Sequence, residues 1–219
     1  FDGDGDRLGV VSSKGRIVWG DQLLAFLSKD VLKNMPNSSI IADVKASQNL
    51  FNEIEKNGGI PIMWKTGHSF IKSKMKEISA PLAGEMSGHI FFADRYLGYD
   101  DGIYAALRVL ELIKDRYTLD NFLDSLPKTF STQEIKIECS DDKKFDIIKE
   151  LARTLDSEKI KVNKVDGLRV QKEDGWWLLR ASNTQAVLVA RVEAKSKNSL
   201  NNLQKELNLY LDKFNLSLS

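Results

Sequence analysis

Hydrophobic and polar positions in the first half of the chain form alternating blocks of two kinds. Short apolar runs of strand type occupy residues 40–44, 60–66 and 89–94, and segments with helical apolar spacing occupy residues 48–59 and 68–78. Strands that alternate with helices at this interval predict a parallel sheet with crossover helices.

A longer helix is predicted over residues 100–117, with acidic residues at its start and basic residues near its end, as the helix dipole favours. Its apolar residues fall on one stripe: Ile103, Ala106, Leu107, Leu110 and Ile113. Residues 118–127 predict a further short helix that Pro127 closes.

The pattern changes after Pro127, which predicts a domain boundary there. The dipeptide Asp174-Gly175 is a turn signal between two strand-like runs. Beyond Pro127 a strand is predicted at residues 133–139 and a helix at 141–157. Three strands follow, two in the halves of 167–182 and one at 186–194. A final helix carries an apolar stripe from Leu200 to Phe214. This β-α-β-β-β-α order predicts an antiparallel sheet that two helices cover.

Charge and composition narrow the class of partner. Of the 219 residues 42% are hydrophobic, enough for a sizeable core, and 32 Lys and Arg nearly balance 31 Asp and Glu. This balance provides no long-range field for nucleic acid or an anionic membrane. We expect neither as a partner.

The same data indicate a cytoplasmic protein. The single cysteine, Cys139, cannot form an internal disulfide, which fits a reducing compartment. The apolar runs are far shorter than the roughly 20 residues of a membrane-spanning helix, and the N-terminus lacks the features of a signal peptide. We therefore expect a cytoplasmic location.

The chain opens on FDGDGDR, in which an aspartate stands at every second position. Glycines between Asp2, Asp4 and Asp6 allow the backbone to bend so that the carboxylates converge, and converging carboxylates favour a hard cation such as Mg²⁺ or Ca²⁺. An EF-hand is excluded, because Arg7 stands where its loop needs glycine and Ser13 where it needs a bidentate acid. A solvated acidic turn is the alternative, although Arg7 favours a phosphate that shares the metal.

Two polar loops follow neighbouring predicted strands. Lys45 lies just after the strand at residues 40–44, and the segment KTGHS, residues 65–69, places His68 after the next one. Ligands of parallel sheets bind beyond the carboxyl ends of the strands. A solvated side chain is the alternative for each residue alone, but the two together indicate a binding site.

The segment GEMSGH, residues 84–89, gathers a carboxylate, a hydroxyl and an imidazole. Glu85 and Ser87 match vicinal sugar hydroxyls, each of which donates and accepts hydrogen bonds. His89 is a candidate proton carrier near neutral pH, although a histidine packed for structure is commoner. A tight turn with incidental polar residues is the alternative for the whole segment.

The segment RASNT, residues 180–184, lies between the last two predicted strands. An arginine, two hydroxyls, an amide and backbone N–H groups in one turn form a cradle for an anion of phosphate size. Arg180 is the residue that points to phosphate, because its guanidinium fork matches phosphate bidentately. A polar hairpin turn is the alternative.

In this order the four loops resemble those of the α-D-phosphohexomutase superfamily, the phosphomannomutase/phosphoglucomutase enzymes. In that family DGDGDR is the metal-binding loop, GEMSGH the sugar-recognition loop and RASNT the phosphate-binding loop, and KTGHS and DGIYAALRVLE recur with them. The resemblance implies a mixed, mostly parallel α/β sandwich followed by an α+β C-terminal domain. It assigns residues 1–16 to the end of the family's second domain, 17–128 to its third and 129–219 to its C-terminal domain.

The resemblance implies a role for each matched residue of the first loop. Asp2, Asp4 and Asp6 would hold Mg²⁺, whose remaining position the phosphate of a catalytic phosphoserine fills. Arg7 would lie beside that phosphate. The complete enzyme would also need a hexose bisphosphate as activator.

For the sugar, the resemblance implies that Glu85 and Ser87 take the hydroxyls at positions three and four, so that one site accepts two flipped orientations. Lys45, His68 and His89 would line the reacting end, with His89 as a general acid or base. The substrates would be the 1- and 6-phosphates of mannose or glucose.

For the phosphate that is not transferred, the resemblance implies a clamp of Arg180, Ser182, Asn183 and Thr184. The reaction would be phosphoryl transfer between C1 and C6 through a bisphosphate intermediate. The fourth loop departs from the family pattern at Gln185 and Ala186, where the family usually has Glu-Pro, and we expect a less rigid loop there.

A second departure concerns the nucleophile. The family's serine lies in the first of four domains, upstream of the metal loop, whereas this chain begins at Phe1, and no serine here lies in such a context. We expect the metal loop to be frayed, the chain alone to be inactive, and N-terminal domains to complete it in cis or in trans. The alternatives are a non-catalytic phosphosugar-binding module and a remnant of a split gene.

Overall fold

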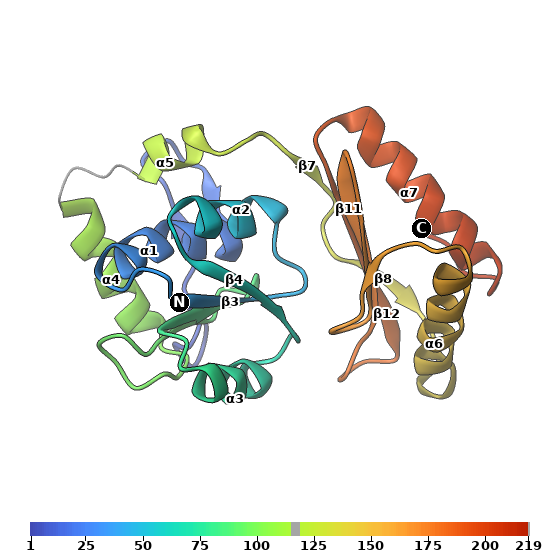
Figure 1. Ribbon diagram of the computed structural model, residues 1–219, viewed down its shortest axis with the longest axis horizontal. Helices are drawn as coiled ribbons and strands as arrows, with labels where there is room; N and C mark the ends of the chain where they lie inside the picture. The colour runs from blue at the N-terminus through green and yellow to red at the C-terminus, as the bar shows by residue number, and fades with distance from the viewer. Residues whose placement is uncertain (115–118, 219) are drawn as a thin grey trace. The chain divides into compact units, whose positions relative to one another are not determined.

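Two units, Phe1–Pro127 and Lys128–Ser219, form the chain in the computed structural model, in which residues 1–114 and 119–218 are described (Figure 1). The strands of the first unit are β1 (Val10–Val11), β2 (Ile17–Val18), β3 (Ser39–Asp43), β4 (Ile60–Trp64), β5 (Leu82–Gly84) and β6 (Ile90–Phe92). Its helices are α1 (Gly20–Asn34), α2 (Gln48–Lys56), α3 (His68–Ile78), α4 (Gly102–Lys114) and α5 (Leu119–Ser125).

The central sheet of the first unit has the strand order β4-β3-β5-β6. Strand β3 pairs in parallel with β4 and β5, whereas β6 runs antiparallel to β5. The mixed, mostly parallel sheet is therefore confirmed, and the all-parallel pattern is wrong at β6. Residues 85–89 are too few for a crossover, so the chain must return antiparallel to β5.

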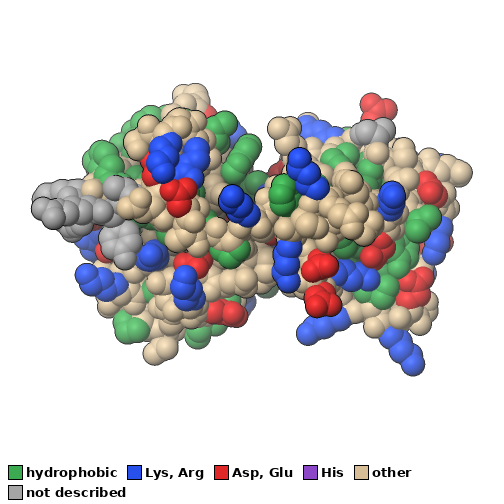
Figure 2. Space-filling view, turned by 90° about the horizontal axis from the view of Figure 1, so that it is seen from above, with side chains coloured by type: hydrophobic (Ala, Val, Ile, Leu, Met, Phe, Trp, Pro, Cys, Tyr) green, Lys and Arg blue, Asp and Glu red, His purple; other side chains and the backbone are tan. Residues whose placement is uncertain are grey.

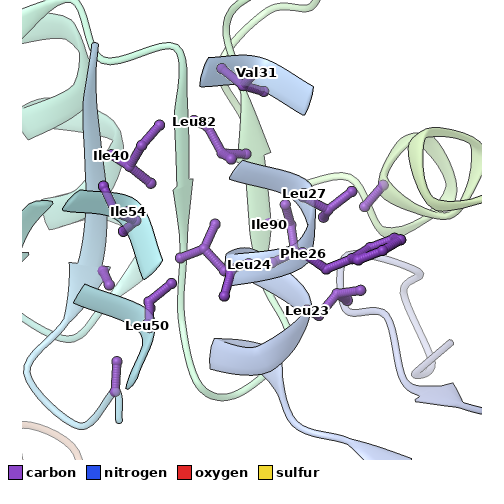
Figure 3. Close-up of a cluster of buried hydrophobic side chains, with 14 of the residues drawn as sticks. Leu23, Leu24, Phe26, Leu27, Val31, Ile40, Leu50, Ile54, Leu82 and Ile90 are labelled. Carbon is purple, nitrogen blue, oxygen red and sulfur yellow. The ribbon is translucent and has the colours of Figure 1, made fainter. Parts of the chain in front are cut away.

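Helices cover both faces of this sheet (Figure 1). Side chains alternate along β3, so Ile40 and Ala42 join one core cluster and Ile41 joins the other. Figure 3 shows the first cluster, where α1 and α2 meet the sheet: Leu23, Leu24, Phe26, Leu27, Val31, Ile40, Leu50, Ile54, Leu82 and Ile90. The second cluster packs β3 and β5 against Ile71 and Met75 of α3. The strand ends are thus held rigidly between two apolar layers.

Helix α4 carries apolar residues on two sides. Ala105 and Val109 are buried in the first core cluster. The stripe predicted from the sequence instead faces outward, with Ile103 60%, Leu107 59%, Leu110 57% and Ile113 40% exposed. The end predicted for this helix, at residue 117, lies outside the described residues. A groove of about 550 Å³ runs beside α4 and is lined in part by Leu110, Ile113 and the segment from Leu8 to Ser13.

The second unit is an antiparallel sheet with both of its helices on one side (Figure 1). Its elements are β7 (Phe130–Ser131), β8 (Ile135–Glu138), α6 (Asp141–Ser157), β9 (Val162–Asn163), β10 (Leu168–Lys172), β11 (Gly175–Ala181), β12 (Val187–Ala194) and α7 (Lys197–Asp212). The strand order is β7-β12-β11-β10-β9, and β8 also pairs with β12. This confirms the α+β fold predicted for the C-terminal part.

Surface composition agrees with the near-zero net charge. On the face in Figure 2, Lys and Arg side chains are interspersed with Asp and Glu. In the described ranges, no helix has the length and apolarity needed to cross a bilayer.

A buried carboxylate fastens the hairpin β1–β2 to α5. Asp120 is 5% exposed and accepts hydrogen bonds from the Ser12 hydroxyl at 2.7 Å, from the Ser13 hydroxyl and from the Arg16 guanidinium. The Ser13, Arg16 and Ser12 bonds, in that order, hold the pKa of Asp120 well below its usual range. The metal loop just before the hairpin is therefore connected to the rest of the unit at this point.

We expect Asp120→Asn to lower the free energy of unfolding at pH 7, measured by urea denaturation. Because the folded pKa is depressed, the contribution of Asp120 is present above its unfolded pKa of about 4 and is lost as the pH falls below it. The difference between wild type and variant should therefore shrink from pH 5 to pH 3. Asp124→Asn is the control, since that side chain is 49% exposed and binds the same Arg16. Equal losses for the two variants would contradict this account.

Candidate active site

The first loop brings its three aspartates together. One carboxylate oxygen each from Asp2, Asp4 and Asp6 lies within 4.8 Å of the others. The Arg7 backbone N–H donates to Asp2 Oδ1 at 3.2 Å, and the Arg7 guanidinium pairs with Asp2 Oδ2. Partial desolvation acts to raise the pKa of Asp2, but the bonds and charge of Arg7 outweigh it and lower the pKa to about 2. Arg7 thus stabilises Asp2 as a carboxylate at the start of the loop.

These residues fit a divalent cation. The Asp6 Oδ1 atom is buried and accepts no hydrogen bond from any described residue, although His89 Nε2 and Arg7 Nε lie 3.4 and 3.7 Å from it. Oxygen ligands alone suit a hard ion such as Mg²⁺. A second group, Asp6, His89 and Asp100, is also close enough to share an ion. It fits less well, because a metal needs the neutral imidazole and the raised pKa of His89 disfavours that form.

The metal loop is anchored to two other parts of the unit. Leu8 N–H donates to the Gly88 carbonyl at 3.1 Å, and Arg7 forms a β-bridge with His89. Gly102 N–H, at the start of α4, donates to the Gly5 carbonyl at 3.0 Å. These contacts hold the loop in place, so the fraying expected for it from the sequence is not observed.

Glu85 connects the sugar-type loop to the loop after β4. Its side chain is 3% exposed, its Oε1 accepts a hydrogen bond from Gly67 N–H at 2.6 Å, and its Oε2 lies 3.0 Å from His89 Nδ1. Burial acts to raise the pKa of Glu85, but the bonds from His89 and Gly67 and the charge of Lys45 outweigh it, so the pKa is lowered. A buried carboxylate with these partners is stable as an anion.

His89 carries this connection on to the metal loop. Its Nε2 lies 3.4 Å from Asp6 Oδ1, and its Nδ1 is also 3.0 Å from the hydroxyl of Ser87, which is exposed. The hydrogen bond with Glu85 raises the pKa of His89 against the effect of burial, and the charges of Asp6 and Asp100 add to it. Glu85, His89 and Asp6 therefore form one continuous charged chain.

Lys45 and His68 lie at the neighbouring strand ends, as the sequence predicts. Lys45 is 7% exposed, with Nζ 3.8 Å from Asp43 Oδ2. His68 is exposed, with Nδ1 3.7 Å from Asp100 Oδ2 and its ring centroid 6.3 Å from that of His89. The strand order β4-β3-β5 is what places the loops that follow them side by side.

The fourth predicted loop lies in the second unit. Arg180 is at the end of β11 and is 7% exposed, whereas Asn183 and Thr184 are exposed. The Ser182 hydroxyl accepts the backbone N–H groups of Thr184 at 3.3 Å and Gln185 at 3.1 Å, so these groups are already used within the turn. The turn is thus ordered by its own serine.

Two further bonds hold the part of this loop that departs from the family pattern. Lys144 of α6 donates from Nζ to the Gln185 carbonyl at 2.9 Å, and Cys139 N–H donates to the Ala186 carbonyl at 3.1 Å. Both carbonyls are therefore fixed without the proline. The greater mobility expected from Gln185 and Ala186 stays a prediction.

Three residues that shape the site were missed from the sequence. At the start of α4, the Tyr104 N–H donates to Asp101 Oδ1 at 2.8 Å, whereas Asp100 pairs with Lys72 at 2.9 Å beside His68. Asp21 Oδ2 accepts the Ser47 N–H at 2.9 Å and fixes the loop of Lys45. The third residue is Gly102. For Asp100 the visible signal was the acidic pair at the start of α4, which the sequence analysis assigned to the helix dipole; for Asp21 there was none, because α1 itself was not predicted.

This arrangement defines a class of protein: an α/β unit that carries a loop of converging carboxylates and a loop with a buried glutamate, followed by a second unit that carries a loop with a buried arginine. Two family models match the chain, phosphoglucomutase/phosphomannomutase alpha/beta/alpha domain III over residues 19–130 and the C-terminal domain of the same family over residues 134–209. The chain belongs to the phosphoglucomutase/phosphomannomutase family.

Several relatives are similar over nearly the whole chain. Phosphomannomutase/phosphoglucomutase of Pseudomonas putida is 48% identical over 205 residues, which are 93% of this chain and 44% of the relative. Phosphoglucomutase of Neisseria gonorrhoeae is 44% identical over 206 residues, 93% of this chain and 45% of the relative. The chain thus spans less than half the length of these relatives.

Solved structures agree on the fold. The crystal structure of a phosphoglucomutase/phosphomannomutase family protein from Burkholderia thailandensis has a TM-score of 0.90 and 42% identity, and the match covers 97% of this chain and 45% of that one. N-acetylphosphoglucosamine mutase of Aspergillus fumigatus, solved in complex with GlcNAc-6P and magnesium, shares the fold at a TM-score of 0.64 and 16% identity, over 93% of this chain and 49% of that one.

We expect Gly102→Ala to weaken Mg²⁺ binding. A Cβ at this position would lie 2.8 Å from the carbonyl oxygens of Gly5 and Arg7, so the metal loop would have to move. The Mg²⁺ dissociation constant measured by calorimetry should rise roughly tenfold, as for other changes that disturb the orientation of metal ligands.

The matched control is Gly9→Ala, because a Cβ there meets nothing within 4 Å. Circular dichroism would verify that both variants are folded. Equal Mg²⁺ affinities for Gly102→Ala and Gly9→Ala would contradict the role given to Gly102.

Proposed function

We propose that the chain supplies the metal-, sugar- and phosphate-binding part of a phosphohexomutase, an enzyme that moves a phosphoryl group between C1 and C6 of a hexose phosphate. The observation that carries this proposal is the charged chain from Glu85 through His89 to Asp6, which joins a sugar-type loop to a metal-type loop. Membership of the family supports it.

In this proposal Asp2, Asp4 and Asp6 hold Mg²⁺, consistent with their converging oxygens and with the buried Asp6 Oδ1, which accepts no hydrogen bond from a described residue. Bound there, Mg²⁺ supplies charge neutralisation to a phosphoryl group. Arg7 contributes further positive charge, since half of its side chain is exposed beside the loop. Lys45 adds a third, buried cation near the sugar-type loop.

The sugar is held by Glu85 and Ser87 in this proposal. A carboxylate has about four lone-pair sites, so Glu85 can accept from sugar hydroxyls while it keeps its bonds to Gly67 and His89. His89, between Glu85 and Asp6, is the group placed to move a proton on or off the reacting hydroxyl, and His68 lies beside it.

The phosphate that is not transferred binds to Arg180, Ser182, Asn183 and Thr184 of the second unit. Mannose and glucose phosphates are the substrates we propose, since relatives in Pseudomonas and Neisseria bear the names phosphomannomutase/phosphoglucomutase and phosphoglucomutase. A cytoplasmic location suits such substrates. We assign residues 1–16, 17–128 and 129–219 to the end of the second, the third and the C-terminal family domain.

The phosphoserine that donates the phosphoryl group lies, in this proposal, on an N-terminal half outside the 219 residues. In the first half-reaction the serine Oγ–P bond breaks as a P–O bond to a sugar hydroxyl forms, and that hydroxyl loses its proton to a base. In the second, after the bisphosphate reorients, the P–O bond at the other end of the sugar breaks as the serine Oγ–P bond re-forms, and the sugar oxygen regains a proton. The exposed apolar stripe of α4 is evidence for a further polypeptide that covers it, since Leu107 and Leu110 leave apolar surface open to water. In this proposal that polypeptide is the N-terminal half.

We expect no mutase turnover from the chain alone, with glucose 1-phosphate, Mg²⁺ and a hexose bisphosphate activator. Turnover should appear when the N-terminal half of the Pseudomonas putida relative is added in trans. Leu107→Asp should reduce this recovery at least tenfold, because it places a charge on the apolar stripe without disturbing the core.

The control variant is Leu209→Asp, which changes a leucine on α7 of the second unit that is 68% exposed, and it should leave the recovery unchanged. Clear activity from the pure chain would sink the proposal of a missing serine. Hexose phosphate binding with no recovery at any ratio of the two halves would favour the alternative, a non-catalytic phosphosugar-binding module.

A further inference from the structure

Asp166 lies directly against the arginine of the proposed phosphate loop. Arg180 Nε donates to Asp166 Oδ2 at 3.0 Å, and Arg180 Nη2 donates to Asp166 Oδ1 at 3.4 Å. The two side chains are only 8% and 14% exposed, so solvent screens this pair weakly. The carboxylate therefore occupies one edge of the guanidinium, the edge formed by Nε and Nη2.

The other edge of the guanidinium stays available. A guanidinium has five N–H donors in a fixed plane, and Asp166 takes one from Nε and one from Nη2. Among the residues that the structure describes, none accepts a hydrogen bond from Arg180 Nη1. The Nη1–Nη2 edge is thus free to bind two oxygens of a phosphate in the fork geometry that arginine favours.

A glycine makes this contact possible. Gly167 precedes β10, and its φ is +81°, a backbone conformation that residues other than glycine rarely adopt. A Cβ at Gly167 would lie 2.5 Å from both Arg180 Cβ and the Leu179 carbonyl oxygen. Only glycine lets the turn approach β11 so closely, and this approach brings the Asp166 carboxylate to Arg180.

We propose that Asp166 is a positioning residue of the phosphate site, which fixes the Arg180 guanidinium by one edge so that the opposite edge meets the phosphate. This inference rests on the proposed function of the loop around Arg180. In this proposal the Asp166–Gly167 turn does not contact the phosphate and acts only through Arg180.

Positioning and simple electrostatics predict opposite effects of removing the carboxylate. A negative charge near the site repels phosphate, so its loss alone would tighten binding. If the carboxylate orders Arg180, its loss frees a side chain that must then be immobilised on binding, and binding weakens. The sign of the change therefore separates the two.

The experiment is a titration of the 219-residue chain with inorganic phosphate, followed by the NMR signals of the amides of residues 182–184. We expect Arg180→Ala to abolish the response and Asp166→Asn to raise the dissociation constant roughly tenfold. Asp156→Asn, which removes an exposed carboxylate paired with Lys164 in the same unit, is the matched control and should leave the constant unchanged.

A second readout reports the guanidinium directly. Rotation about the Arg180 Nε–Cζ bond, measured by NMR exchange of the Nη protons, should be slow in the wild type and fast in Asp166→Asn, while the melting temperatures of the two stay within a few degrees. A purely structural role of Asp166 would lower the melting temperature without this difference.

The outcomes separate the two proposals. No response of the wild type to phosphate, or an unchanged response in Arg180→Ala, overturns the function proposed for the loop. Binding that is lost in Arg180→Ala but unchanged or tighter in Asp166→Asn overturns the role of Asp166 alone.

Discussion

The candidate site depends on the pairing of the buried Glu85 carboxylate with Gly67 and His89. Removing a charge from water is costly unless it is paired, and Glu85 meets this condition by bonding Gly67 of one loop and His89 of its own. His89 also lies next to Asp6, so the position that the buried Glu85 imposes on His89 in turn affects the position of Asp6 in the metal loop. Three loops that are far apart in sequence thus form a coupled unit.

The same two devices, a paired buried carboxylate and a glycine at a point of close approach, recur in both units. In the first unit Asp120 fastens the hairpin that follows the metal loop, and Gly102 lets that loop lie against α4. In the second unit Asp166 holds Arg180, and Gly167 allows the approach. Each polar loop is therefore positioned by contacts made outside its own motif.

Much of the fold followed from periodicity, because β3, α2, β4, α3 and the longer elements of the second unit bury regular apolar faces, whereas the two-residue strands β7 and β9 were too short to be predicted. Helix α1 was missed although Leu23, Leu27 and Val31 carry helical spacing. Strand β5 has three residues, too few for any period, and without it β6 was assigned the wrong direction. The apolar stripe of α4 was predicted, but its outward direction could not be, because the spacing of apolar residues does not indicate which surface they pack against.

For the site, motif loops could be found from residue types, but their supports could not. Asp100, Asp166 and Gly102 act through contacts with residues distant in sequence, and only the folded chain brings these together. The Asp166-Gly167 dipeptide is a visible turn signal, yet nothing in the sequence links it to Arg180. The register of β10 and β11, which pairs Leu168 with Leu179, makes that link.

The most direct test of this coupling is the Mg²⁺ affinity of Glu85→Ala, measured by calorimetry on the folded chain. Glu85 is not among the carboxylates proposed to hold the ion. If the metal loop bound Mg²⁺ independently of the other loops, the loss of Glu85 would leave the affinity unchanged. The coupling through His89 to Asp6 predicts a dissociation constant that rises roughly tenfold or more. An unchanged affinity, with the core intact by circular dichroism, would contradict the account.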